Sequence, residues 1–129
     1  MDCRALALAV SGLVAQDQKT PLRSAPDFSR EVVPILRICA RCHNADLAEG
    51  GLRLDSRAGL RKGGNSGKAV VPGDATASLL FRRLTDTDPL RRMPQIRDPL
   101  SQEQIDIVRR WIDAGARWPT GVTVGPRKP

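Results

Sequence analysis

The stretch that decides the fold is Cys39-Ala40-Arg41-Cys42-His43, a sequence of the form C-x-x-C-H. This pattern is typical of a covalent attachment site for c-type haem. The thiols of Cys39 and Cys42 would each add to a haem vinyl group, and His43 would bind the iron as proximal ligand. Because the two vinyl groups sit on neighbouring pyrrole rings, both sulfurs must come from one tight turn. The motif therefore predicts one covalently bound haem c with its iron.

The second axial ligand follows by elimination. His43 is the single histidine of the chain, so a second imidazole is excluded. The two methionines are Met1 and Met93, and Met1 would leave with the N-terminal segment described below. Met93 is therefore the expected distal ligand, and His/Met ligation is typical of electron transfer because methionine favours Fe(II). The alternative is that Met93 only fills a gap in the core.

Length and composition indicate a single small domain with a weak core of its own. The chain has 129 residues, two Phe, two Trp and no Tyr. A small domain buries a smaller share of its surface than a large one and often needs an added staple. A covalently held haem would supply that staple, so we expect the haem-free chain to fold poorly.

The net charge of the chain indicates which partners it could bind. The formal net charge is +7, which favours an acidic redox partner protein and allows peripheral contact with an anionic membrane. Ordinary solubilising charge is the simpler interpretation. Nucleic acid is disfavoured, because the chain lacks stacking aromatic residues and any known binding motif. Nothing in the sequence resembles an interface between copies, so a monomer is expected.

The N-terminus resembles a signal peptide over residues 1–15. Arg4 is followed by an apolar run from Ala5 to Ala15, too short to span a bilayer. We therefore expect export, to a periplasm or similar compartment, with a linker over residues 16–26. The cleavage site stays open because Leu13 fits the usual pattern poorly, and an ordinary N-terminal helix is the alternative. Loss of Cys3 would leave only the two haem-binding thiols in an oxidising compartment.

The first helix should begin after Asp27, a good N-cap residue. Pro34 lies inside this segment and predicts a kink or a later start. After His43, residues 44–53 should form a loop in which one backbone carbonyl accepts the His43 Nδ1 proton. The apolar stripe that delivers the haem motif to the core comprises Phe28, Val32, Ile35, Leu36 and Cys39.

Two short helices are expected next. The first is capped by Asp55 or Ser56 and stops at Gly63. Residues 63–68 are glycine-rich, but their spacing does not match a phosphate-binding loop, so a turn is the better interpretation. The second helix opens at Asp74 or Thr76. Its inward residues would be Ala77, Leu80, Phe81 and Leu84.

Residues 85–99 should be irregular, with Met93 at their centre. A loop of this length without regular structure is usually functional, and here it would place the thioether over the haem. Arg91, Arg92 and Arg97 flank Met93 and would pair with a haem propionate, bind an acidic partner, or simply be solvated.

The last helix should run from a capping box at Ser101 and Gln104 to about Ala114, with Gly115 as its stop. Trp111 is expected in the core rather than as a redox relay, and residues 120–129 as a disordered basic tail. The expected inner face is Ile105, Val108, Trp111 and Ile112. The expected outer face is Glu103, Asp106, Arg110 and Asp113.

Taken together, these residues resemble the planctomycete-type cytochrome c domain, a monohaem variant of class I cytochrome c. The resemblance implies an all-α, class I cytochrome c-like fold over residues 27–119, with the terminal helices packed across one another beside the haem. It also implies proximal His43 and distal Met93. Its carriers are Val33-Pro34-Ile35-Leu36, Cys39 to His43, Gly50-Gly51-Leu52-Arg53-Leu54-Asp55-Ser56, Val71-Pro72-Gly73, Ser78-Leu79-Leu80, Arg92-Met93-Pro94 and Trp111-Ile112-Asp113-Ala114-Gly115-Ala116.

Two departures from the family pattern are visible. Gln95 stands where the family usually has a second proline after Met-Pro, which could loosen the Met93 loop. Lys68 occupies a place often taken by proline. In the family this domain is commonly the front part of a longer protein, so the chain is either a stand-alone carrier or a module of a larger redox protein.

The leading function is that of an electron carrier without catalytic residues. A haem sensor, or a small-ligand-binding or peroxidase-like domain with a labile Met93, is the alternative, although no second histidine is present to act as a distal base. A structural zinc site on Cys39, Cys42 and His43 would lack a fourth ligand. A thioredoxin-like dithiol would lack its βαβ surroundings.

Overall fold

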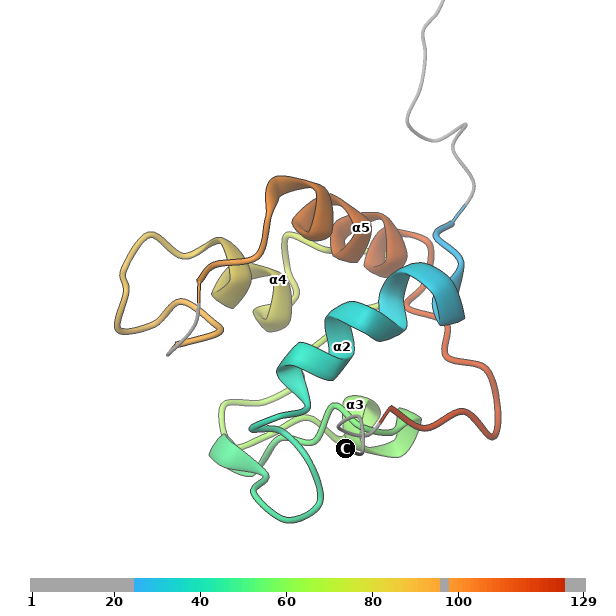
Figure 1. The fold of residues 1–129 in the computed structure, drawn as a ribbon, viewed down its shortest axis with the longest axis horizontal. Helices are drawn as coiled ribbons and strands as arrows, with labels where there is room; N and C mark the ends of the chain where they lie inside the picture. The colour runs from blue at the N-terminus through green and yellow to red at the C-terminus, as the bar shows by residue number, and fades with distance from the viewer. Residues whose placement is uncertain (1–24, 96–97, 125–129) are drawn as a thin grey trace, which may run out of the picture.

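The computed structural model describes residues 25–95 and 98–124. The expected signal peptide, most of the linker, Arg97 and the end of the tail lie outside these residues. Within them the chain is helical, and the only bridge is an isolated one between Gly64 and Gly67. The expectation of an all-α fold is confirmed. The elements, shown in Figure 1, are η2 (Phe28–Val32), α2 (Val33–Cys39), η3 (Glu49–Gly51), α3 (Arg57–Lys62), α4 (Leu79–Thr85) and α5 (Gln102–Asp113).

The first helix changes its type just before Pro34. The Asp27 carboxylate caps it by accepting a hydrogen bond from Arg30 N at 3.0 Å. The first turn, η2, is a π-helix, and the α-helical part α2 starts at Val33 with Pro34 in its first turn. Proline is tolerated there because that N–H has no partner within the helix. The expected break at Pro34 is therefore present as a change of helix type.

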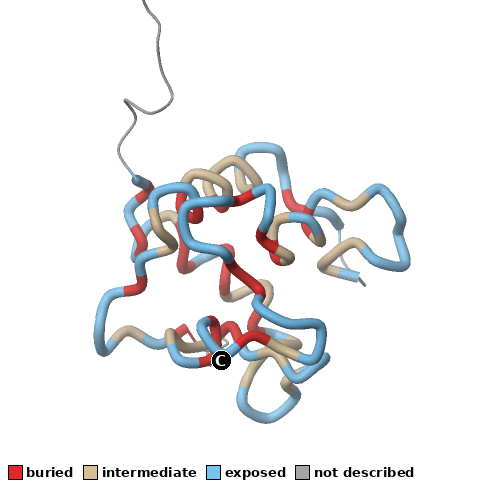
Figure 2. Tube along the Cα trace, turned by 180° about the vertical axis from the view of Figure 1, so that it is seen from behind, coloured by how far each residue is buried: buried red, intermediate tan, exposed pale blue. Residues whose placement is uncertain are grey.

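The first and the last helices meet where η2 contacts α5. Phe28 packs against Trp111 and Trp118, with ring centroids 6.0 and 4.9 Å apart. Trp111 Nε1 donates to Arg117 O at 2.8 Å and Trp118 Nε1 to Val122 O at 2.7 Å, so both buried indoles are satisfied. Trp111 is a core residue, as expected. Figure 2 shows buried positions both along the helices and in the segments that connect them, whereas the outermost loops are exposed.

Helix α5 begins as the sequence predicts. Ser101 Oγ accepts from Gln104 N at 3.1 Å, and Gln104 Oε1 accepts from Ser101 N at 2.9 Å, which completes the capping box. The expected outer face is wrong at Arg110. Its side chain is only 15% exposed, because it lies along the helix to bond Asp106 Oδ2 at 2.9 Å.

Helix α3 is capped by Ser56, whose Oγ accepts from Gly59 N at 3.1 Å, and it ends at Gly63. Helix α4 begins later than expected. The Asp74 carboxylate accepts from Ala77 N at 3.2 Å and so forms a turn, which leaves Ala77 exposed. Asp side chains compete with the helix for backbone donors in this way. Leu80 and Leu84 are buried as expected.

The tail contacts the body of the domain at Val124. Val124 is fully buried, and its N–H donates to Asp55 O at 2.8 Å. The disorder of residues 120–129 stays a prediction. None of the helices in the described ranges is long and apolar enough to cross a membrane.

Candidate haem-binding site

A cavity of about 610 Å³ lies between the end of α2 and helix α4. Cys39, Cys42 and His43 line it from the turn after α2, and Met93 lines it from the segment after α4. The structure thus brings all the sequence-predicted site residues to one cavity. Its volume falls within the range of about 300–1,000 Å³ that cofactor pockets occupy.

The haem motif forms a tight hydrogen-bonded turn. His43 N donates to Cys39 O at 3.0 Å, and Cys42 N donates to the same carbonyl at 3.2 Å. Asn44 Nδ2 also donates to Ala40 O at 2.7 Å, which adds a side-chain hydrogen bond across the turn. Both thiols consequently come from one turn, as two thioether bonds to neighbouring pyrroles require.

His43 is held with one ring nitrogen already engaged. Its Nδ1 lies 2.9 Å from Glu49 O. A carbonyl oxygen only accepts, so Nδ1 carries the proton and Nε2 keeps its lone pair for a metal. Glu49 is itself fixed, because its N–H donates to Cys42 O at 3.0 Å. The expectation that a carbonyl of residues 44–53 orients His43 is confirmed, and that carbonyl belongs to Glu49.

Burial raises the pKa of the Cys39 thiol from 9.0 to about 11. The thiol is therefore protonated at neutral pH. Disulfide exchange needs a thiolate, which redox-active C-x-x-C sites obtain by lowering a cysteine pKa. The environment of Cys39 acts in the opposite direction, which argues against the thioredoxin-like alternative.

Met93 reaches the cavity from an irregular segment that is fastened to α4. Its side chain is half-buried and packs against the core. Its N–H donates to Arg83 O at 2.9 Å. Methionine, being unbranched and polarisable, suits either core filling or ligation, and the fact that Met93 lines the same cavity as His43 favours ligation.

The arginines near the cavity are not all those the sequence suggested. Arg91 lines it and lies 3.5 Å from Asp86 Oδ2, whereas Arg92 is not among the lining residues. Arg83 also lines the cavity and was missed. Its i, i+3 spacing to Leu80, which lines the same cavity, could have revealed it.

The remaining lining fits a flat apolar group held by sulfur and nitrogen donors. Most of the wall is aliphatic, and it includes Ile38, Leu52, Leu54, Leu79, Leu80 and Leu84. In the described part of the chain, no three His, Cys, Asp or Glu side chains converge as a metal site would require. The zinc alternative therefore has no ligand cluster to support it there.

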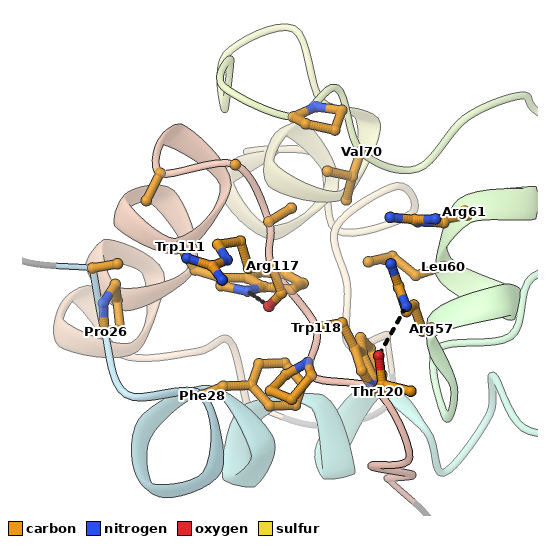
Figure 3. A pocket seen from close by; sticks show the side chains of 16 residues that line it. Pro26, Phe28, Arg57, Leu60, Arg61, Val70, Trp111, Arg117, Trp118 and Thr120 are labelled. Atoms are coloured by element: carbon orange, nitrogen blue, oxygen red, sulfur yellow. Dashed lines mark hydrogen bonds between the residues drawn. The ribbon is translucent and has the colours of Figure 1, made fainter.

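A second cavity, of about 620 Å³, lies beside the aromatic cluster and shares no lining residue with the first (Figure 3). Trp111, Trp118 and Phe28 line it together with arginines such as Arg57, whose Nη1 donates to Thr120 Oγ1 at 3.4 Å. None of its lining residues is a cysteine, histidine, methionine or carboxylate. The candidate iron ligands and the two cysteines therefore line only the first cavity.

The fold and the site agree with those of a haem-carrying c-type cytochrome domain. Residues 39–95 match the model of the family described as Planctomycete cytochrome C. This part of the chain is thus a planctomycete cytochrome c domain with a cytochrome c-like helical fold, and the resemblance seen in the sequence is confirmed. No curated protein and no solved structure matches the chain significantly.

Proposed function

We propose that the protein carries single electrons through one haem c, anchored by Cys39 and Cys42 and ligated by His43 and Met93. The observation that carries this proposal is that His43 and Met93 line the same cavity, and each is held by a backbone hydrogen bond. When bound, the haem supplies the one-electron Fe(III)/Fe(II) couple.

The residues of the chain have separate roles in this proposal. Glu49 O holds the His43 ring in the tautomer that leaves Nε2 free. Met93 provides a soft sulfur ligand that favours Fe(II) and so raises the reduction potential. The aliphatic wall keeps water from the site. No side chain is required to move a proton, as suits a carrier rather than an enzyme.

Substitution of Met93 tests the proposal. In the Met93→Ala holoprotein no thioether of the domain replaces the lost ligand, so a weaker donor such as water must bind. We expect the potential to fall by a substantial part of the roughly 0.8 V that axial ligation spans. We also expect carbon monoxide to bind the reduced variant readily, and the reduced wild type only in the small fraction from which Met93 has dissociated. Redox titration and absorption spectra measure both.

Thr87→Ala is the matched control, because Thr87 is exposed in the same segment after α4 and does not line the cavity. It should keep the wild-type potential. If the reduced wild type already binds carbon monoxide fully, Met93 is not a firm ligand. The sensor or ligand-binding function then replaces the carrier.

We further propose that residues 1–15 direct export to the periplasm, that residues 27–119 form the functional domain, and that the protein works as a monomer with an acidic redox partner. The net charge of +7 supports the choice of partner. A reporter fused to residues 1–26 should be exported, whereas the same fusion with Leu8→Asp, which interrupts the apolar run, should stay inside. Equal retention of both fusions would contradict the export proposal.

A further inference from the structure

Residues 86–95, which follow α4 and carry Met93, are irregular but extensively hydrogen-bonded. In its first part, Leu90 N donates to Asp88 Oδ1 at 2.9 Å. Arg91 N and Arg92 N both donate to Asp88 O, at 2.9 and 2.8 Å. The chain up to Arg92 is therefore held by its own turns, independently of Met93.

The backbone of Met93 is restrained by one hydrogen bond, made by its N–H group. Its N–H donates to Arg83 O in the last part of α4. The next residue, Pro94, has no N–H to offer. Any restraint on the C-terminal side of Met93 must therefore come from Gln95 or from a residue beyond it.

The side chain of Gln95 provides that restraint. Its Nε2 donates to Leu90 O at 2.8 Å, a good amide hydrogen bond. This bond closes the loop of residues 90–95 around Met93. In the sequence, Gln95 in place of a second proline could loosen this loop. In the structure, the Gln95 side chain instead closes the loop through its hydrogen bond to Leu90 O.

We propose that Gln95 is a positioning residue that keeps the Met93 thioether at the haem iron by closing the loop of residues 90–95. The proposal rests on the proposed function, because it concerns the ligand assigned there. Gln95 acts through Leu90 O and the loop and has no contact with the iron. Loss of one such hydrogen bond changes an equilibrium by about 2- to 12-fold.

The test uses the holoprotein with Gln95→Ala and Gln95→Glu. The second variant keeps the length of the side chain but removes its N–H donor. We expect both to raise the fraction of protein with Met93 dissociated by about 2- to 12-fold. The measurements are the rate at which the reduced protein binds carbon monoxide, which methionine dissociation limits, and the intensity of the methionine-to-ferric-iron absorption band.

Gln102→Ala is the control. Gln102 is also an exposed glutamine, at the start of α5, and its side chain makes no hydrogen bond to the described residues. It should bind carbon monoxide at the wild-type rate. If both Gln95 variants also do so, the positioning role is overturned while Met93 ligation stands. If the wild type lacks the methionine band, the proposed function fails and the role of Gln95 fails with it.

Discussion

Gly63 lacks a side chain, which allows the tight turn of residues 63–67. Gly64, Ser66 and Gly67 of this turn line the proposed haem cavity. Gly63 ends α3 with φ +76°, and an added Cβ would lie 2.5 Å from Gly67 O. The atoms in the way are backbone atoms, which cannot rotate aside. The turn of residues 63–67 is therefore closed by contact as well as by the hydrogen bond from Gly64 N to Gly67 O at 3.0 Å.

We expect Gly63→Ala to lower the free energy of unfolding of the holoprotein by about 2–5 kcal/mol, the sum of left-handed strain and overpacking. Gly121→Ala is the control, since Gly121 has φ +83° but open space around its Cβ position. It should cost only the strain, about 1–2 kcal/mol. Urea unfolding of the two variants measures the difference, and equal losses would contradict the contact argument.

Residue-level predictions succeeded where the chemistry is local. The C-x-x-C-H spacing and the scarcity of His and Met were sufficient to select four residues that the fold then places at one cavity. Arg83 was missed because its role depends on which face of α4 points to that cavity. The Gln95 contact was missed because a side-chain bond within a loop leaves no periodic pattern in the sequence.

At the scale of elements, α5 has the most stabilising local contacts. The Asp106 carboxylate pairs with Arg109 at i+3 and with Arg110 at i+4, each about one helical turn further along the same face. The hydrogen bond from Arg110, with a further one from Arg109, holds the pKa of Asp106 below its ordinary value of 3.8. The carboxylate therefore contributes stability above that value, and the contribution is lost as pH falls through the lower pKa of the folded protein.

Asp106→Asn should accordingly cost up to about 1 kcal/mol at pH 7, a modest value because the pair is partly exposed. The difference from wild type should shrink below pH 4 and vanish at more acidic pH. Unfolding measured across this pH range tests the sign. Asp98→Asn, at an exposed carboxylate without an ion pair among the described residues, should change the stability at pH 7 by less than Asp106→Asn does.

Elements with a strong local signal were predicted well, and those governed by competition were not. The capping box at Ser101 fixed the start of α5, and Gly63 the end of α3. The start of α4 was wrong because Asp74 uses its carboxylate to form a turn. An aspartate can cap a helix or form a turn, and which of the two it does depends on neighbours that are distant in sequence. Here one such neighbour is Asp113, whose Oδ1 accepts from Ala75 N at 2.9 Å.

For the whole molecule, the core is small and the cofactor cavity is a large part of the interior. The aliphatic residues that line the cavity would be wetted without a haem, and only four aromatic side chains are available to compensate. Small domains have little stability in reserve. We therefore expect folding to depend on the covalent cofactor.

The double variant Cys39→Ser, Cys42→Ser should therefore lack covalent haem and show little stable helix. Circular dichroism during heating should give no cooperative transition. Arg41→Ser is the control, because Arg41 is exposed within the same turn and both thiols remain. A cooperative transition in the haem-free double variant would contradict the view that haem completes the fold.

The hydrogen bond from Val124 N to Asp55 O joins the end of the described chain to the segment just after the proximal ligand. The adjacent Leu54 donates its N–H to His43 O at 2.8 Å. The C-terminal segment is consequently linked to His43 through Asp55 and Leu54. A force applied to this segment would therefore reach His43 within a few bonds. Truncations and reporter fusions should leave residues 118–124 intact, and a tether for electrode or force measurements attached there would pull on the haem pocket itself.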